Sequence, residues 1–301
     1  MNILVIGDIV GRPGRKAIRE LLPQIQKDYK IVFTIANAEN AAGGRGLSRE
    51  VMKELLSHNI DVLTMGNHVW DNKEILNFID DEHRLIRPAN YPPYCPGQGY
   101  HIYSAAFNQK IAVVNASGRV FLPSLDCPFR VVDEIVSEIQ KESDLIIIDF
   151  HAEATSEKLA FAHFFDGRVA AVLGTHTHVQ TADEKVLPGG TAYITDLGMT
   201  GPVDSILGMQ KEQVIEKIIY QRPVRLEVAK GACQLQAVVL NFDEASCKCI
   251  SINRISQELR PRVPAIKPFH FYFLNSTKNP QCLPSLFLPV VSLDKAWPSS
   301  S

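Results

Sequence analysis

The chain has 301 residues, of which 46% are hydrophobic and 21% are charged, and its formal net charge is -2. This composition excludes a disordered or fibrous protein for most of the chain, and the length allows a large buried core. The near balance between basic and acidic residues argues against a protein that binds nucleic acid or an acidic membrane through bulk charge.

The cellular setting is predicted from features that the sequence lacks. Its first eight residues have neither the basic start nor the small-residue cleavage site of a signal peptide. No run reaches the ~18 apolar residues of a transmembrane helix, so we expect no membrane partner. The six cysteines are scattered without a Cys-x-x-Cys pair, which indicates reduced thiols. We therefore expect a cytoplasmic protein.

The first eighty residues alternate between short apolar runs and segments with helical spacing. The runs are at 2–6, 31–36 and 61–65, and the helical segments are at 14–28, 48–57 and 71–79. Ser48 is a suitable N-cap for the second helix, and Asp71 with Glu74 resembles a capping arrangement for the third. This alternation predicts a parallel sheet covered by helices.

The rest of the chain continues this pattern with some changes. Strands are expected at 110–115, 145–150 and 169–173, and helices near 130–141 and 210–219. Between 190 and 253 the apolar runs are shorter and more strand-like, which indicates a second sheet. After residue 255 the chain is rich in proline and serine without a clear period. We therefore predict one domain over 1–255 and a tail of undefined role over 256–301.

Residues able to bind metal follow the predicted strands one after another. They are Asp8, Glu39 with Asn40, Asn67 with His68, His151, and His176 with His178. Ligands of α/β sheets bind at the carboxyl ends of the strands, so these ends direct carboxylate, amide and imidazole groups to one place. Oxygen and nitrogen ligands without thiolate favour iron, manganese or zinc. The set is large enough for two metal ions, with Glu39 as the candidate bridge, and such a pair can activate water against a phosphate ester.

Each of these residues also has an ordinary structural interpretation. Asp8 can cap the following helix, Asn67 can belong to a turn, and His151 can be a packed core histidine. His176 and His178 would share one face of a strand, which by itself is a weak signal for metal. Independent turns, however, give no reason for ligand-type residues at five successive strand ends.

A glycine-rich segment at 43–46 closely follows Glu39 and Asn40. It matches neither the phosphate-binding loop of nucleotide hydrolases nor the dinucleotide fingerprint. We expect a loop at the mouth of the site, with Arg45 as a candidate substrate contact.

Several stretches of the sequence form an ordered set of motifs. They are residues 7–11 (GDIVG), 37–44 (NAENAAGG), 66–71 (GNHVWD), 87–92 (RPANYP), 149–158 (DFHAEATSEK), 174–183 (GTHTHVQTAD) and 189–202. In these motifs, over residues 1–254, the chain resembles the calcineurin-like metallophosphoesterases. It is most similar to their bacterial branch of 2′,3′-cyclic-nucleotide 2′-phosphodiesterases. The wider superfamily has Asp-x-His and a bridging Asp, where this chain has Asp8-Ile9-Val10 and Glu39, and both changes are typical of the branch.

The resemblance implies a fold and a ligand set. The fold is a four-layer α/β/β/α sandwich, that is, two packed sheets flanked by helices, with two divalent or mixed-valent ions, iron or manganese before zinc. One ion would be held by Asp8, Glu39, Asn40 and His178, and the other by Glu39, Asn67, His151 and His176. His68 resembles the proton donor of the family. Members of the branch are similar in forming homo-oligomers.

Three functions are compatible with these motifs. The leading hypothesis is a dinuclear phosphodiesterase that converts 2′,3′-cyclic nucleotides to 3′-nucleotides, with His68 as general acid. The same ligands would serve a phosphomonoesterase or an RNA-directed phosphodiesterase, since loops select the substrate. A nucleotide-binding regulatory protein with little catalysis is the third, although an intact ligand set argues against it.

Overall fold

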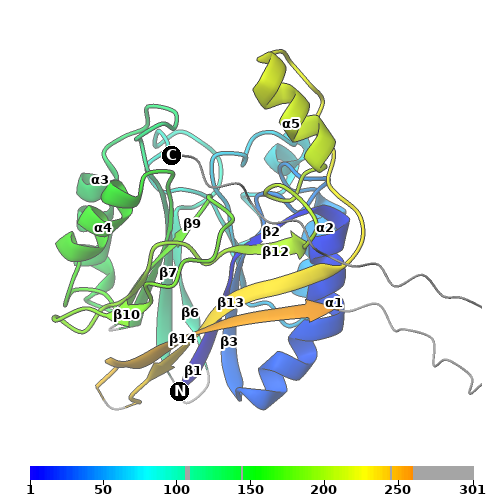
Figure 1. Ribbon diagram of the computed structural model, residues 1–301. Helices are drawn as coiled ribbons and strands as arrows, with labels where there is room; N and C mark the ends of the chain where they lie inside the picture. Colours follow the sequence, from blue (N-terminus) through cyan, green and yellow to red (C-terminus); the bar gives the residue numbers. More distant parts are fainter. Residues whose placement is uncertain (106–108, 144, 245, 260–301) are drawn as a thin grey trace, which may run out of the picture. The chain divides into compact units, whose positions relative to one another are not determined.

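A computed structural model describes residues 1–259 apart from 106–108, 144 and 245, and its strands form two β-sheets (Figure 1). The eight-stranded sheet contains β1 (Asn2–Ile6), β2 (Asp8–Ile9), β3 (Ile31–Asn37), β4 (Val62–Thr64), β5 (Leu85–Ile86), β12 (Met199–Pro202), β13 (Cys233–Phe242) and β14 (Cys249–Leu259). The six-stranded sheet contains β6 (Tyr100–Ser104), β7 (Lys110–Ser117), β8 (Leu145–His151), β9 (Ala171–Thr175), β10 (Lys185–Val186) and β11 (Ala192–Ile194). The helices are α1 (Gly11–Asp28), α2 (Arg49–Leu56), α3 (Pro128–Ile139), α4 (Thr155–Phe164), α5 (Lys211–Tyr220) and the 3-10 helix η1 (Lys73–Asn77).

Alternating side chains along the strands produce three hydrophobic layers. In β1, Leu4 and Ile6 pack in a cluster with α1 and α2, whereas Ile3 and Val5 pack against the second sheet. A third cluster fills the space between the second sheet and helices α3 and α4. The order of layers is therefore α/β/β/α, which confirms the fold class expected from the sequence. Among the described residues no helix is long and apolar enough to cross a membrane.

The register of the parallel strands brings their carboxyl ends level. In the first sheet Ile6 pairs with Ala36, and Ala36 pairs with Leu63. In the second sheet His151 pairs with Ser117 on one side and with Thr175 on the other. Chain segments that leave these strands therefore start from one edge of each sheet, which is where an α/β protein builds its site.

From the sequence we expected residues 190–253 to form the second sheet, but among the described residues this range contributes only β11 to it. The second sheet is built mainly on β7, β8 and β9, while β12, β13 and β14 join the first sheet. The link is β13, which pairs antiparallel with β1, Ile6 lying opposite Ala237. Apolar periodicity identifies a strand but carries no information about its partner, because strand pairing is a long-range contact.

Two element boundaries also differ from the predictions. The helix expected from Asp71 to Ile79 is the short η1, with Asn72 at its N-cap, because the Asn72 side chain accepts the backbone N–H of Glu74 at 3.1 Å. The domain end predicted at 255 lies inside β14, where residues 256–259 continue the pairing with β13 to Leu259. The remainder of the predicted tail, 260–301, lies outside the described residues.

The aromatic cluster beneath the second sheet provides a stability test. Phe161 of α4 is fully buried and stacks on Phe150 with ring centroids 4.0 Å apart. Phe161→Ala should lower the free energy of unfolding by about 3–5 kcal/mol, because it removes buried area and leaves a cavity. Its neighbour Phe164 is 47% exposed, so Phe164→Ala should cost less than about 1.5 kcal/mol. Urea unfolding of both variants measures the difference, and equal losses would contradict this packing.

Candidate metal centre

The structure brings all seven predicted metal ligands to the shared carboxyl edge of the two sheets. From the first sheet, Asp8 opens β2, Glu39 and Asn40 follow β3, and Asn67 follows β4. From the second sheet, His151 ends β8, and His176 and His178 follow β9. Asp8, Glu39 and His151 are completely buried. Residues that are far apart in the sequence therefore meet in one polar cluster inside the protein.

One half of the cluster is centred on Nε2 of His151. This atom lies 3.0 Å from Oδ1 of Asn67, 3.0 Å from Nδ1 of His176 and 3.3 Å from Oε1 of Glu39. Glu39, His151 and His176 each direct one ligand atom to a common point, with these atoms within 4.8 Å of one another. Carboxylate, imidazole and amide groups in this arrangement suit a first-row transition metal.

The other half of the cluster contains Asp8, Asn40 and His178. Nε2 of His178 lies 3.2 Å from the Asn40 amide and 3.7 Å from Oδ1 of Asp8, and the Asn40 amide also lies 3.0 Å from Oε1 of Glu39. Oδ1 of Asp8 is buried and has no hydrogen-bond partner among the described residues. A buried, unpaired carboxylate oxygen is costly unless a cation binds to it. These residues therefore fit a metal ion, and Glu39 lies between the two halves.

Each imidazole directs one ring nitrogen into the cluster and contacts an outer partner with the other. Nδ1 of His151 is hydrogen-bonded to Oγ1 of Thr175 at 2.9 Å, and Nδ1 of His178 to the Leu207 carbonyl at 3.1 Å. Nε2 of His176 lies 2.9 Å from a carboxylate oxygen of Glu153. The two last partners can only accept a proton, so His176 and His178 must donate to them. Each ring directs its other nitrogen inward, where it would offer a lone pair once a metal displaces any proton on it, and such outer partners are the usual support of a metal-bound histidine.

A chain of hydrogen bonds places a proton on Nδ1 of His151. Thr175 Oγ1 donates to Oδ1 of Asp149 at 2.6 Å, so it accepts from Nδ1 of His151. Oδ2 of the same carboxylate accepts from Asn37 Nδ2 at 3.0 Å and from Thr64 Oγ1 at 2.5 Å. Asn37 and Thr64 belong to the first sheet, whereas Asp149 and Thr175 belong to the second. Asp149 therefore joins the two sheets directly beneath the cluster.

Charge within the cluster favours ionised carboxylates. Burial opposes ionisation of Asp8, but its contact with His178 lowers the pKa well below the usual value. Glu39 behaves in the same way, since His151 lowers its pKa against the effect of burial. Burial also opposes a charged His151, yet Glu39 and Asp8 raise its pKa to about 9. Burial and the charge of His151 lower the pKa of His176 to about 4. Asp8 and Glu39 are therefore buried, ionised carboxylates with imidazole nitrogens around them.

His68 lies at the open side of the cluster. Its backbone N–H donates to Oε2 of Glu39 at 3.0 Å, and its Nδ1 lies 2.9 Å from Oδ2 of Asp71. The His68 side chain is 24% exposed, in contrast to the buried His151. Arg45 is farther out, 60% exposed, with Nη1 3.9 Å from the same Asp71 oxygen. Nε2 of His68 is thus left to meet a molecule entering from solvent.

The loop that carries His176 and His178 differs from the prediction. Strand β9 ends at Thr175, and the two histidines have φ values of 97° and 64°, so they do not share one face of a strand. Positive φ is unfavourable for residues other than glycine and persists only where the surroundings enforce it. The period-two argument fails here because the chain has already left the sheet.

A buried ion pair holds this loop in place. Lys158 and Asp196 are 1% and 0% exposed, and Nζ of Lys158 donates to Oδ2 of Asp196 at 2.9 Å and to the Thr175 carbonyl at 2.8 Å. The same Asp196 oxygen accepts from the backbone N–H of Thr177 at 3.0 Å and from its hydroxyl at 2.7 Å. Thr177 stands between the two histidines, so the pair fixes both of them. We did not foresee this pair, and the only sequence signal for it is a lysine at the end of the 149–158 motif.

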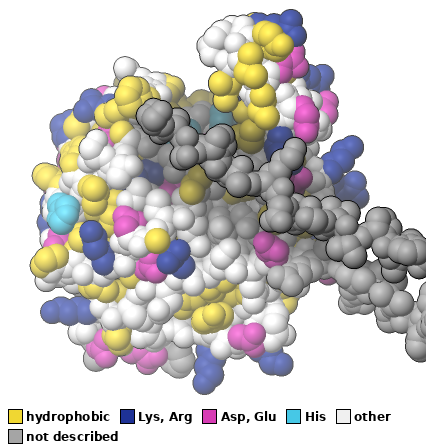
Figure 2. All heavy atoms as spheres, in the orientation of Figure 1, with side chains coloured by type: hydrophobic (Ala, Val, Ile, Leu, Met, Phe, Trp, Pro, Cys, Tyr) yellow, Lys and Arg dark blue, Asp and Glu magenta, His cyan; other side chains and the backbone are white. Residues whose placement is uncertain are grey.

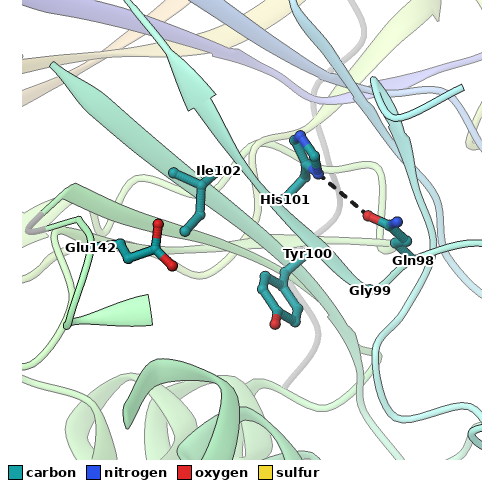
Figure 3. Close-up of a pocket in the computed structure, with 6 residues that line it drawn as sticks. All are labelled: Gln98, Gly99, Tyr100, His101, Ile102 and Glu142. Atoms are coloured by element: carbon teal, nitrogen blue, oxygen red, sulfur yellow. Dashed lines mark hydrogen bonds between the residues drawn. The ribbon is translucent and has the colours of Figure 1, made fainter. Parts of the chain in front are cut away.

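A cavity of about 500 Å³ lies away from the cluster, along the edge strand β6 (Figure 3). Gln98 and His101 face each other there at 3.3 Å, and Gly99, Tyr100, Ile102 and Glu142 complete the lining. None of the predicted ligands lines this cavity. Cavity size alone therefore does not identify the site in this protein.

The comparisons with known proteins agree with the fold. A 2′,3′-cyclic-nucleotide 2′-phosphodiesterase of Bacillus subtilis strain 168 is 52% identical over 255 residues, which are 85% of this chain and 96% of the relative. The crystal structure of a novel phosphatase from Mycoplasma pneumoniae is 37% identical with a TM-score of 0.81, covering 87% of this chain and 95% of the other. A calcineurin-like phosphoesterase of Bacillus subtilis, 12% identical with a TM-score of 0.50, covers 85% of this chain and 90% of its own and shows a likeness of fold.

The fold is thus that of the calcineurin-like phosphoesterases, as the sequence motifs led us to expect. A family model described as YmdB-like protein matches residues 4–255. The chain belongs to this YmdB-like family.

Gly66 tests the close packing of the cluster. A Cβ atom at this position would lie 2.3 Å from Oε2 of Glu39 and 2.4 Å from Nε2 of His151. Gly66→Ala should therefore displace both groups and reduce the metal bound per chain to less than half, measured by elemental analysis after loading. As a control, Gly190→Ala should keep its metal, because a Cβ there meets no atom within 4 Å. Its φ of 101° makes the substitution lower the stability without touching the cluster. Full metal content in Gly66→Ala would show that the cluster is looser than described.

The Lys158–Asp196 pair predicts a separation of stability from metal affinity. Lys158→Met should cost about 3–5 kcal/mol, because it leaves a buried carboxylate uncompensated. The double variant Lys158→Met, Asp196→Leu should recover only part of that stability, since apolar groups replace the ion pair but leave the N–H groups of Thr177 and Gly198 without their acceptor. It should still bind metal about 10–100-fold more weakly, because Thr177 has lost its acceptor. Urea unfolding and a metal titration measure the two effects, and wild-type metal affinity in the double variant would refute the positioning role.

Proposed function

We propose that this chain is a dinuclear metal-dependent phosphodiesterase that hydrolyses 2′,3′-cyclic nucleotides to 3′-nucleotides. The observation that carries the proposal is the convergence of inward-facing imidazole nitrogens and buried carboxylates at the edge of both sheets. The identity of 52% to a relative with this activity, over nearly its whole length, supports the choice of reaction.

The ligand assignment follows the two halves of the cluster. We assign Asp8, Asn40 and His178 to one ion and Asn67, His151 and His176 to the other, with Glu39 bridging them. Two ions at this position would lower the pKa of a bound water and take up negative charge on the phosphate. Iron or manganese is our first choice and zinc the next, because mixed oxygen and nitrogen ligands accept each of them.

His68 is the proposed general acid. Asp71 holds its Nδ1 at 2.9 Å, which orients the ring and leaves Nε2 for the substrate. The partial exposure of the ring allows it to reach the ribose oxygen that leaves phosphorus, and to donate the proton which that oxygen needs. Arg45, at the outer rim, is assigned to substrate binding.

The resemblance to the family and the sequence suggest further expectations about the location and assembly of the protein. We expect a cytoplasmic homo-oligomer, which light scattering of the purified protein would test. The likeness to a protein described as a novel phosphatase keeps a monoesterase as the second candidate. RNA is a third substrate class, because a cyclic phosphate also occurs at RNA ends.

The first experiment is hydrolysis of 2′,3′-cyclic AMP with metal analysis of the same sample, before and after chelation and after addition of Mn²⁺. We expect about two metal ions per chain and release of 3′-AMP that chelation abolishes and Mn²⁺ restores. A nucleoside monophosphate is assayed in parallel. Preference for the monoester would replace the diesterase by a phosphatase, and metal binding without any hydrolysis would favour a regulatory role.

Two variants separate metal binding from proton transfer. Asp8→Ala should lose metal and activity together, because it removes a proposed ligand. His68→Ala should keep both ions and lose about 10²–10⁴-fold in kcat, the usual contribution of a general acid. Elemental analysis and initial rates measure both quantities. Full activity of His68→Ala would remove the assigned role without affecting the ligand assignment.

A further inference from the structure

A second cavity, of about 310 Å³, opens beside the mouth of the metal centre. One wall is the glycine-rich loop, at Gly43 and Arg45, and the other is formed by Met209, helix α5 and the segment 224–226. Helix α5 stands away from the sheets in Figure 1, and the chain returns from it to β13. The cavity thus lies between the loop that follows Asn40 and a separate projection of the chain.

The lining of this cavity is basic. Arg45, Lys217 and Arg225 contribute to it, and no carboxylate is among its lining residues. Neighbouring charges on the same projection are already paired, Lys211 with Asp204 and Arg222 with Glu216. Figure 2 shows Lys and Arg side chains on this projection beside hydrophobic ones. Within the described part of the chain, neither Lys217 nor Arg225 has a carboxylate partner.

Both walls of the cavity are bonded to proposed metal ligands. Gly44 N–H donates to the Asn40 carbonyl at 3.1 Å. On the opposite wall, Nδ1 of His178 bonds the carbonyl of Leu207, two residues before Met209. Arg45 reaches toward Asp71, which holds His68. A molecule whose reacting group lies at the metal centre therefore has the cavity next to it.

Lys217 and Arg225 have no carboxylate partner in the described part of the chain, and Arg45 has only Asp71 at 3.9 Å. Three such cations around one cavity attract an anion, and a phosphate group is the anion that this substrate class can supply. A cyclic mononucleotide has one phosphate, which the metal centre would engage. An oligoribonucleotide that ends in a 2′,3′-cyclic phosphate has a second phosphate on the 5′ oxygen of the same nucleoside. This second phosphate is absent from the mononucleotide, so the cavity gives the protein a means to distinguish the two.

We propose that the cavity lined by Arg45, Lys217 and Arg225 binds the 5′-side phosphate of an RNA chain whose 2′,3′-cyclic end lies at the metal centre. The inference rests on the proposed diesterase function and specifies its substrate as RNA ends. The cavity itself takes no part in bond breaking. It adds binding energy for longer substrates through charge, and this contribution weakens as salt increases.

The test compares kcat/KM for three substrates: 2′,3′-cyclic AMP, its 5′-phosphorylated form, and the dinucleotide ApA with a terminal 2′,3′-cyclic phosphate. We expect kcat/KM to be roughly three- to tenfold higher for the dinucleotide than for the mononucleotide, the scale of a few exposed charge contacts. The variant Lys217→Ala, Arg225→Ala should reduce this ratio to about one. Lys230→Ala is the matched control, because it removes an exposed lysine outside the cavity, and it should keep the ratio.

The outcomes are distinct. A ratio near one in the wild type, or a ratio unchanged in the double variant, would overturn the inference while the diesterase function stands. An equal gain with the 5′-phosphorylated mononucleotide would assign the cavity to a terminal 5′-phosphate and reject RNA. Calorimetric binding of the products, 3′-AMP and ApA 3′-phosphate, is measured alongside. If no substrate is hydrolysed but the dinucleotide product binds more tightly and only the double variant loses this preference, the reaction is wrong and the cavity assignment remains.

Discussion

The buried carboxylate of Asp149 is the interaction on which the site depends. It accepts hydrogen bonds from Asn37 and Thr64 of the first sheet and from Thr175 of the second. Burial raises its pKa to about 6, and the surrounding donors and the charge of His151 act in the opposite direction. A carboxylate with several donors in a dry interior has one favourable geometry, so it sets the two sheets against each other at their carboxyl edges. Through Thr175 it also orients His151, which lies at the centre of the proposed ligand set.

From Asp149 outward, the residues of the site become less tightly held and more exposed to solvent. His176 and His178 are held in unfavourable backbone conformations by the Lys158–Asp196 pair, which shows that local strain is stored where ligand geometry matters. His68 and Arg45 lie progressively nearer to solvent. Metal ligands must be fixed before a metal arrives, whereas the groups that meet the substrate must allow entry and release. The basic cavity is the outermost part of this gradient.

Much of the fold and of the candidate site was predictable from the sequence. Alternating apolar runs identified most strands, and Ser48 was correctly predicted to cap α2, where its side chain accepts the N–H of Val51 at 3.3 Å. Ligand-type residues at successive strand ends indicated one shared site, because parallel strands direct their carboxyl ends to the same edge. The prediction failed where the structure of a segment depends on contacts with other parts of the chain. Examples are the pairing of β12 and β13 with the first sheet and the short helix η1.

The sequence by itself determined the residue types at the strand ends, their order and the family to which the chain belongs. Only the tertiary structure decided which groups meet, because contacts such as Asp149 with Asn37 or Lys158 with Asp196 join residues that no local pattern connects. It also decided that Arg45, Lys217 and Arg225 share a cavity. Local periodicity reports which face of an element is apolar, whereas pairing, proton position and charge convergence depend on distances across the folded chain.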